Sequence, residues 1–300
     1  MSNNLNSQQK AALKYIDGPL LVLAGAGSGK TSVITQKIAY LVEQCDIPAR
    51  NIAAVTFTNK AAREMKARVS KLMPKDKARG LTVSTFHNLG LNIIRTEIKT
   101  LGFKPGFSIL DQEDCRKLLK ELMVRHSELD DKLLDQVQST ISNWKNSLLE
   151  PGQATGAADS TGEQGIAMLY ERYQRALKAY NAVDFDDLIM TPVMLFKQHP
   201  DILNKWQRRI RYLLVDEYQD TNLAQYELVR TLVNEKQALT VVGDDDQSIY
   251  AWRGARPENL MQLQTDFPGL EIIKLEQNYR STGRILRAAN TLIDNNPHLI

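Results

Sequence analysis

A glycine-rich segment between an apolar run and a helical pattern is the first part of the sequence that could do chemistry. It reads AGAGSGKT, from Ala24 to Thr31. Glycines let backbone N–H groups approach phosphate oxygens, and the N-terminus of the following helix adds positive potential. Lys30 would reach the β- and γ-phosphates, and the Thr31 hydroxyl can ligate Mg²⁺. An unliganded turn is the alternative, but the strand-loop-helix context favours a site for ATP and Mg²⁺, formed by Ala24, Gly25, Ala26, Gly27, Ser28, Gly29, Lys30 and Thr31.

A pair of carboxylates follows a second apolar run, in the segment LLVDEYQD at residues 213–220. Asp216 would hold the magnesium ion, largely through water, and Glu217 would orient and deprotonate the attacking water. A buried strand that ends in Asp-Glu is common, so a purely structural role is the alternative. Together with the glycine-rich loop, the pair predicts nucleotide hydrolysis.

The segment VVGDDDQSIYAWRGA, at residues 241–255, also passes from an apolar run into polar residues. Asp244 and Gln247 could sense magnesium-bound water and the γ-phosphate. Two aromatic rings and a guanidinium follow within a few residues, namely Tyr250, Trp252 and Arg253. Aromatic rings stack nucleobases at about 1–3 kcal/mol each without reading their sequence. A core position is the alternative for Trp252, but the adjacent Arg-Gly favours an exposed stacking platform.

Six short apolar runs must supply the frame that positions these residues. They are typical of buried strands in a parallel sheet and cover residues 19–23, 51–57, 81–85, 211–215, 239–243 and 271–275. Helical periodicity at residues 31–44 and 60–72 lies between them. Strands and helices therefore alternate as in doubly wound proteins, and the predicted fold class is α/β. Ligands bind such sheets at the carboxyl ends of the strands, where the three segments above are found.

Residues 88–199 break this alternation, because they read as successive amphipathic helices without a strand-like run. We interpret them as an inserted helical domain. Within it, residues 151–165 (PGQATGAADSTGEQG) contain few large apolar side chains. Such a segment has little to offset its ordering entropy, so we predict a flexible loop there.

The bulk composition excludes several classes of protein. A net charge of only +3 over 300 residues gives no global sign of a nucleic-acid binder. Cys45 and Cys115 are far apart and lack metal-ligand spacing, which argues against a disulfide framework or a zinc site. The first residues do not resemble a signal peptide, and no uncharged stretch is long enough to span a bilayer. We expect a cytoplasmic protein without membrane partners.

Eight segments together resemble, in order and spacing, the UvrD/Rep-type superfamily 1 DNA helicases over essentially the whole chain. They are LNSQQ (5–9), AGAGSGKT (24–31), TFTNKAAREM (56–65), STFHNLG (84–90), DFDDL (184–188), LLVDEYQDT (213–221), GDDDQSIYAWRGA (243–255) and LEQNYRST (275–282). The resemblance implies a RecA-like P-loop NTPase core with a parallel sheet and an inserted all-helical domain. It also implies an ATP-dependent motor that translocates 3′ to 5′ on single-stranded DNA and unwinds duplex in DNA replication or repair.

The resemblance assigns further roles at matching positions. Gln9 corresponds to an adenine-reading glutamine, Tyr279 to the aromatic residue that stacks the base, and Arg280 to a γ-phosphate-contacting arginine. Ser32 stands where close relatives have an arginine against adenine, so we expect looser base selectivity. The positions that match DNA-contacting residues are Thr56, Phe57, Asn59, Thr85, Phe86, His87, Phe185, Tyr250, Trp252 and Arg253. Taken alone, His87 would be read as a structural histidine. A second set of basic residues could extend the contact, although a solvated helix face explains them equally well: Lys60, Arg63, Lys66 and Arg68.

The resemblance also divides the chain into domains. Residues 1–87 and 200–275 would form the first RecA-like domain, residues 88–199 the inserted domain, and residues 276–300 the start of a second RecA-like domain. Family members continue for several hundred residues, so we expect these 300 residues alone to bind nucleotide weakly and to hydrolyse it slowly.

Three other functions remain open. The chain could be a non-catalytic fragment that binds nucleotide and single-stranded DNA. It could be a nucleotide-gated switch for protein partners, although the aromatic segment after Gln247 argues against this. It could also be the motor part of a helicase-nuclease, although no nuclease-like carboxylate cluster stands out. Under the helicase hypothesis the partners are single-stranded DNA, duplex junctions, and replication or repair proteins.

Overall fold

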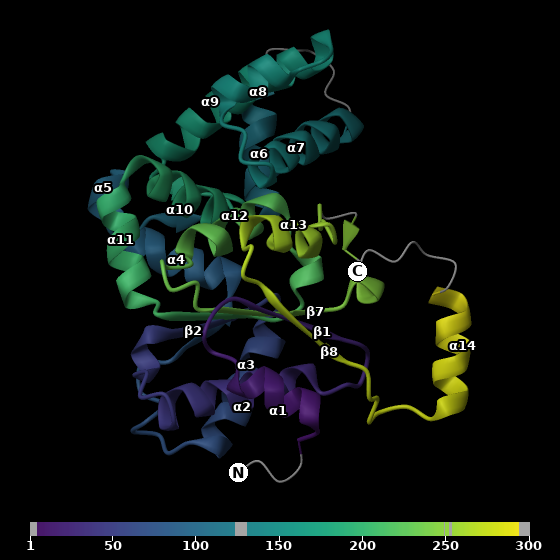
Figure 1. The fold of residues 1–300 in the computed structure, drawn as a ribbon. Coiled ribbons are helices and arrows are strands. Elements are labelled where there is room, and N and C mark those ends of the chain that lie inside the picture. The colour runs from purple at the N-terminus through teal and green to yellow at the C-terminus, as the bar shows by residue number, and fades with distance from the viewer. Residues whose placement is uncertain (1–4, 124–130, 249, 252–253, 294–300) are drawn as a thin grey trace. The chain divides into compact units, whose positions relative to one another are not determined.

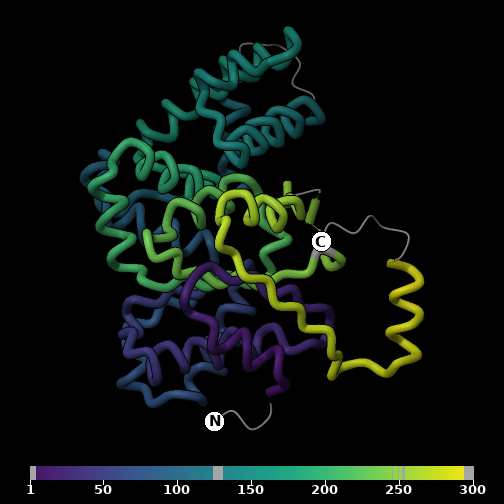
Figure 2. Tube along the Cα trace, in the orientation of Figure 1, coloured from purple at the N-terminus to yellow at the C-terminus, as the bar shows by residue number. Residues whose placement is uncertain are grey.

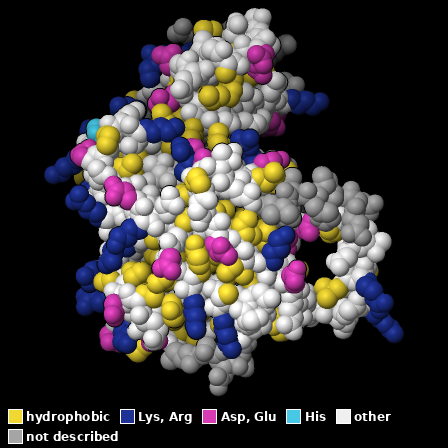
Figure 3. Space-filling view, in the orientation of Figure 1, with side chains coloured by type: hydrophobic (Ala, Val, Ile, Leu, Met, Phe, Trp, Pro, Cys, Tyr) yellow, Lys and Arg dark blue, Asp and Glu magenta, His cyan; other side chains and the backbone are white. Residues whose placement is uncertain are grey.

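The computed structural model describes residues 5–123, 131–248, 250–251 and 254–293. The chain divides into two compact units. Met1–Phe86, Pro200–Asn222 and Val229–Ile300 belong to the first, and His87–His199 and Leu223–Leu228 belong to the second. On the face drawn in Figure 3, basic and acidic side chains are interspersed, in keeping with the small net charge.

A six-stranded parallel sheet is the frame of the first unit (Figure 1). Its strands lie in the order β3-β2-β6-β7-β1-β8. Their bounds are β1 (Leu20–Ala24), β2 (Ile52–Thr56), β3 (Thr82–Thr85), β6 (Tyr212–Val215), β7 (Leu239–Gly243) and β8 (Glu271–Leu275). Each lies within one residue, at either end, of an apolar run predicted from the sequence. The α/β fold class is confirmed, and so is the parallel sheet.

Burial on both faces explains why these runs form strands. Every residue of β2, β6 and β7 is buried, whereas the edge strands β3 and β8 are mostly half-buried or exposed. Central strands of a parallel sheet are covered by helices on both faces and are therefore almost continuously apolar. This pattern distinguishes them from the alternating pattern of a strand with one solvated face.

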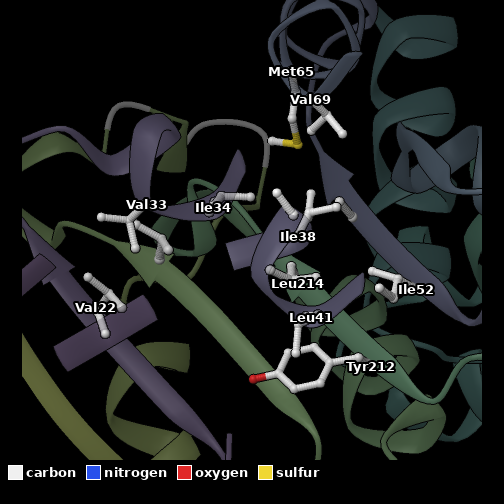
Figure 4. Packing of buried hydrophobic residues seen from close by; sticks show 14 of the residues in the cluster. Val22, Val33, Ile34, Ile38, Leu41, Ile52, Met65, Val69, Tyr212 and Leu214 are labelled. Atoms are coloured by element: carbon white, nitrogen blue, oxygen red, sulfur yellow. The ribbon is translucent and has the colours of Figure 1, made fainter. Parts of the chain in front are cut away.

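The core of the first unit lies between the sheet and the helices α2 (Lys30–Glu43) and α3 (Asn59–Leu72). Ile34, Ile38 and Leu41 recur at helical spacing on α2 and are fully buried, and Met65 and Val69 do the same on α3 (Figure 4). This packing fixes the start of α2, and hence the glycine-rich loop, against the end of β1. The remaining helices of this unit are α1 (Ser7–Lys14), α11 (Pro200–Arg209), α13 (Asn259–Asp266) and α14 (Gly283–Ile293), with 3₁₀ turns η1 (Ala49–Asn51), η2 (Tyr218–Asp220) and η3 (Asp245–Gln247).

The second unit is largely helical. It contains α4 (Phe86–Thr96), which begins at the last residue of the first unit, together with α5 (Ile98–Leu101), α6 (Gln112–Met123), α7 (Asp131–Asn146), α8 (Pro151–Ala157), α9 (Thr161–Ala179) and α10 (Asp187–Gln198). Helix α12 (Leu223–Leu232) divides between the units. Buried side chains of α6, α7 and α9 form one core cluster of the second unit.

The prediction of a flexible loop at residues 151–165 is wrong, because this segment forms α8 and the start of α9. Proline at the first position of α8 suits a helix start, and Glu150 and Gln153 form a reciprocal cap. Ser160 caps α9 by accepting a hydrogen bond from the Glu163 N–H group at 3.2 Å. Ala154 is fully buried in the helical core. Capping and close packing of a small residue supply the order that composition alone did not indicate.

The expectation that residues 88–199 contain no strand also needs correction. A short parallel pair joins β4 (Ser108–Ile109) to β5 (Ala182–Val183). Two-residue strands are too short to produce an alternating pattern. The pairing brings residues 108–109 beside residues 182–183. It therefore fixes the position of the residues that follow Val183 within the second unit.

Within the described residues, no helix combines the length and the apolar character needed to cross a membrane. The tube in Figure 2 follows the chain from β8 through the segment before α14 into α14 itself.

Candidate active site

The glycine-rich loop joins the end of β1 to the start of α2. Gly27 and Gly29 have φ angles of 71° and 92°, in the left-handed region that favours glycine. Ser28 closes the loop, because its hydroxyl donates to the Gly25 carbonyl oxygen at 2.7 Å. The N–H groups of the first turn of α2 face the loop and have no partner within the helix. The geometry therefore fits an anion such as a phosphate chain.

Lys30, the first residue of α2, brings the predicted residues together. Its Nζ atom lies 3.2 Å from Glu217 Oε2 and 3.1 Å from Gln247 Oε1. Lys30 follows β1, Glu217 follows β6 and Gln247 follows β7, so three neighbouring strands of the sheet deliver these groups to one edge. The convergence of the predicted lysine, carboxylate and amide is thus a property of the fold.

Glu217 has an unusual backbone. Its φ angle of 52° lies in the left-handed region, which costs a residue with a Cβ atom about 1–3 kcal/mol. This conformation turns the chain sharply after β6, while the side chain reaches Lys30. Strain of this kind gathers at functional sites, where the surroundings hold it in place.

Asp216 is the buried member of the carboxylate pair. Only 5% of its surface is exposed, and burial together with the charge of Glu217 raises its pKa to about 6. Burial likewise raises the pKa of Asp244, whose carboxylate accepts a hydrogen bond from the Gln247 side chain. A cation beside Asp216 would relieve the cost of burying its charge. The hydroxyl of Thr31 and the carboxylate of Asp216 are the hard oxygen donors that Mg²⁺ prefers.

Among the described residues, no group of three or more His, Cys, Asp and Glu side chains could hold a metal ion by itself. Mg²⁺ that binds with a nucleotide usually takes one or two protein ligands and completes its shell with phosphates and water. A hydroxyl and one carboxylate next to the glycine-rich loop therefore fit a magnesium-nucleotide complex.

The residues assigned to the nucleotide base also contact the glycine-rich loop. Gln9 is buried, and its side-chain amide donates to the Ser28 carbonyl oxygen at 2.9 Å. Tyr279 is 57% exposed, its N–H group donates to the Gly27 carbonyl oxygen at 2.9 Å, and its hydroxyl accepts from the Asn6 amide at 2.9 Å. An aromatic face and an amide thus lie beside one loop, an arrangement that fits a purine base.

Arg280 and Ser32 border the same loop. A Cβ atom built on Gly27 would lie 2.6 Å from the Cβ atom of Arg280, so the backbone of Arg280 passes close to the loop. The Ser32 hydroxyl, in the first turn of α2, accepts a hydrogen bond from the Gln36 amide at 3.1 Å. Ser32 is therefore already part of a side-chain pair on α2.

The predicted DNA-contacting residues of the first unit differ widely in exposure. Thr56, Thr85 and Phe86 are buried, Phe57 is half-buried and Asn59 is exposed. The rings of Phe57 and Phe86 lie 5.2 Å apart and are tilted by 58°. The Phe86 ring is too deeply buried to stack a base, and it packs against Phe57 instead. Tyr250 is half-buried, and the predictions for Trp252 and Arg253 lie outside the described residues.

The second unit carries a stacked aromatic pair. The rings of His87 and Phe185 lie 3.8 Å apart at an interplanar angle of 19°. Phe185 is 55% exposed, whereas burial lowers the pKa of His87 to about 4. Phe185 consequently offers a ring face to a partner, while His87 is a neutral support at physiological pH.

Two residues inside the quoted motifs carry contacts that the sequence did not predict. Gln219 donates to Glu217 Oε2 at 2.9 Å and accepts from the Asp244 N–H group at 3.1 Å, so it bridges the ends of β6 and β7. Asn278 donates to the Ala26 carbonyl oxygen and accepts from the N–H groups of Arg280 and Ser281. The sequence signal for both residues was their place next to Glu217 and Arg280, which had already been assigned roles.

Comparison with known proteins agrees with these features. Residues 5–268 match the UvrD/REP helicase N-terminal domain. The chain is 58% identical over 295 residues to the ATP-dependent DNA helicase Rep of Escherichia coli. The aligned region covers 98% of this chain and 44% of that protein. It is 46% identical over 296 residues to the ATP-dependent DNA helicase PcrA of Staphylococcus aureus (strain COL), covering 98% of this chain and 40% of that protein. The chain thus spans less than half the length of these relatives, and it belongs to the UvrD/REP helicase family, whose N-terminal domain it contains.

Proposed function

We propose that this chain is the N-terminal motor part of an ATP-dependent DNA helicase that translocates 3′ to 5′ on single-stranded DNA and unwinds duplex. The observation that carries the proposal is the convergence of Lys30, Glu217 and Gln247 beside a glycine-rich loop. The direction of movement and a role in DNA replication or repair rest on the family resemblance alone.

Each residue of the site has a proposed role in hydrolysis. The loop N–H groups and Lys30 would bind the phosphate chain, and Thr31 and Asp216 would hold Mg²⁺. The ion, when bound, neutralises charge on the phosphate oxygens. Glu217 would orient the attacking water and accept its proton, a step for which its partial exposure and its contact with Gln219 prepare it. Arg280 would add positive charge near the γ-phosphate.

Coupling to DNA is proposed to run through the segment after β7. Gln247, which contacts Lys30, stands three residues before Tyr250 and five before Trp252. A change at the γ-phosphate would therefore reach the proposed base-stacking residues through a very short length of chain. Together with Phe185, these rings would hold bases while the motor opens and closes.

The domain division at residues 1–87 with 200–275, 88–199, and 276–300 is part of the same proposal. The two compact units support the proposed boundaries near residues 87 and 199, but they place residues 223–228 with the second unit and residues 276–300 with the first. Replication or repair proteins, single-stranded DNA and duplex junctions are the proposed partners. A cytoplasmic location is proposed because both cysteines are free thiols.

Hydrolysis measured under single-turnover conditions, with and without oligothymidylate, tests this function. Glu217→Gln should lower the rate by about 10²- to 10⁴-fold, because the proton acceptor is lost while the size and shape of the side chain are kept. Glu235→Gln, an exposed carboxylate of the same unit, is the matched control and should behave like the unmodified chain. Hydrolysis that survives in Glu217→Gln would rule out the proposed role of this carboxylate.

A fragment that binds nucleotide and single-stranded DNA without turnover is the second candidate. Binding of both ligands without measurable single-turnover hydrolysis would support it. Turnover that DNA does not stimulate would instead favour a nucleotide-gated switch.

A further inference from the structure

A fully buried lysine of the second unit lies beneath the DFDDL segment. Lys145 Nζ, at the C-terminal end of α7, lies 2.6 Å from Asp184 Oδ2 and 2.8 Å from Asp187 Oδ1. The rings of Tyr170 and Tyr173 lie within 6 Å of the same atom, at 5.9 and 5.2 Å. Burial by itself lowers the pKa of Lys145, but the two carboxylates outweigh burial and raise the pKa above its usual value. The lysine is therefore a permanent cation.

The two aspartates also fix the backbone between them. The Asp184 N–H group donates to Asp187 Oδ2 at 3.1 Å, and the Asp187 N–H group donates to Asp184 Oδ1 at 2.9 Å. Asn146, next to the lysine, donates to Asp186 Oδ1 at 3.1 Å. Three of the four residues 184–187 are aspartates, and the end of α7 contacts all three of their carboxylates.

Phe185 is the remaining member of this turn, and its environment is the opposite of that of its neighbours. Asp184 and Asp187 are 6% and 2% exposed, whereas Phe185 is 55% exposed and stacks on His87. A large apolar side chain at this exposure has no support from a core around it. Its direction depends on the turn. Tyr173 and Gln174 each donate to one of the two aspartates, at 3.0 Å, whereas Lys145 bonds both of them.

We propose that Lys145 is a positioning residue for single-stranded DNA: its ion pairs with Asp184 and Asp187 hold Phe185 against His87 with one ring face open to a nucleobase. The proposal rests on the proposed function, which supplies the DNA. A buried ion pair contributes little net stability compared with apolar residues of the same volume. The ion pairs fix the geometry of the turn, which apolar packing of the same volume would not do.

The first test needs no DNA. Stacking under Phe185 should shift the ring protons of His87 upfield in the ¹H NMR spectrum, and loss of that signal in His87→Gln assigns it. Lys145→Met should abolish the upfield shift, because the turn is released. Lys178→Met, an exposed lysine of α9 in the same unit, is the control and should retain the shift. A folded Lys145→Met protein that keeps the shift overturns the proposal.

Removing one partner of a buried ion pair can prevent folding, because two carboxylates are left unpaired. The second variant therefore combines Lys145→Met with Asp184→Asn and Asp187→Asn, which removes the buried charges together. Circular dichroism and thermal unfolding verify that it is folded. It too should lose the upfield shift of His87, and retention of the shift contradicts the proposal.

A double-mutant cycle then connects the turn to DNA. Affinity for fluorescent oligothymidylate is measured at fixed salt for the chain, Lys145→Met, Phe185→Leu and the double variant. Loss of one stacked base should weaken binding by about 5- to 150-fold. The double variant should bind no more weakly than Phe185→Leu, because the lysine acts through that ring. If the affinity losses of the two single variants multiply in the double variant, the proposal is overturned. If the unmodified chain binds no DNA, the proposed function fails, while the NMR result still decides the role of Lys145.

Discussion

The side chain of Gln219 bridges the ends of two neighbouring strands at the candidate active site. It holds Glu217 on one side and the N–H group of Asp244 on the other, and only 1% of its surface is exposed. At the scale of single residues, the position of the proposed proton acceptor therefore depends on a neutral, buried amide. Outer-shell groups that orient metal ligands commonly contribute about 10- to 100-fold to activity, and Gln219 would orient Glu217 in a comparable way.

We predict that Gln219→Leu lowers single-turnover ATP hydrolysis by about 10- to 100-fold. The leucine has nearly the same volume but leaves Glu217 without its amide partner and a buried N–H group without an acceptor. Gln262→Leu on the exposed face of α13 should have no effect. Equal rates for the two variants would show that Glu217 needs no support from Gln219.

His87 gives a prediction about pH. Its pKa is about 4 in the folded protein, because burial disfavours the charged ring, and near 6.5 when unfolded. Between these values the unfolded chain binds more protons, so stability falls as pH decreases from about 6.5 towards 4 and is constant above about 7. Compared with His87→Gln, the chain should lose on the order of 1–3 kcal/mol of unfolding free energy by pH 4.5. Denaturant unfolding from pH 4.5 to 8 measures this difference, and a difference independent of pH would contradict the predicted shift.

Gly90 sets the distance between two helices of the second unit. A Cβ atom at this position of α4 would lie 1.7 Å from the backbone oxygen of Leu188 on α10. Glycine within a helix costs about 1 kcal/mol relative to alanine. Close approach of the two backbones outweighs this cost, because it places α4, which carries His87, directly against the helix that follows Phe185.

We predict that Gly90→Ala destabilises the protein by about 3 kcal/mol or more, since backbone atoms cannot move aside as a flexible side chain can. Gly165→Ala in α9 is the matched control. Nothing lies within 4 Å of its built Cβ atom, so this substitution should stabilise by about 0.5–1 kcal/mol. Thermal unfolding of both variants decides the matter. A Gly90→Ala protein as stable as the unmodified chain would mean that α4 and α10 can separate without cost.

Elements also show how far the sequence could lead. The six strands were predictable because parallel strands are apolar on both faces, and their carboxyl ends had to bring Lys30, Glu217 and Gln247 to one edge. The helix at residues 151–157 was missed because its order comes from caps and from a buried alanine. The contact of Lys145 with Asp184 was not predictable from one sequence, because 39 residues separate them and only tertiary packing joins them.

At the scale of the whole molecule, helix α14 contributes no buried side chain to a hydrophobic core. None of the 11 residues of α14, all of them described, is buried, and Ile285 and Leu292 are 60% and 73% exposed. We therefore expect α14 to contribute little to the stability of the first unit. Slow hydrolysis by the 300-residue chain stays a prediction.

A truncation separates α14 from the sheet that precedes it. A chain ending at Thr282 should unfold within about 2 °C of the complete chain, because tolerance to truncation follows from the burial of what is removed. A chain ending at Leu270 also lacks β8, which pairs with β1 and contributes Leu275 to the core, and should lose cooperative unfolding. Thermal denaturation followed by circular dichroism compares the three chains. If the chain ending at Thr282 melted more than about 5 °C lower, α14 would have to contribute to the packing of the first unit in solution.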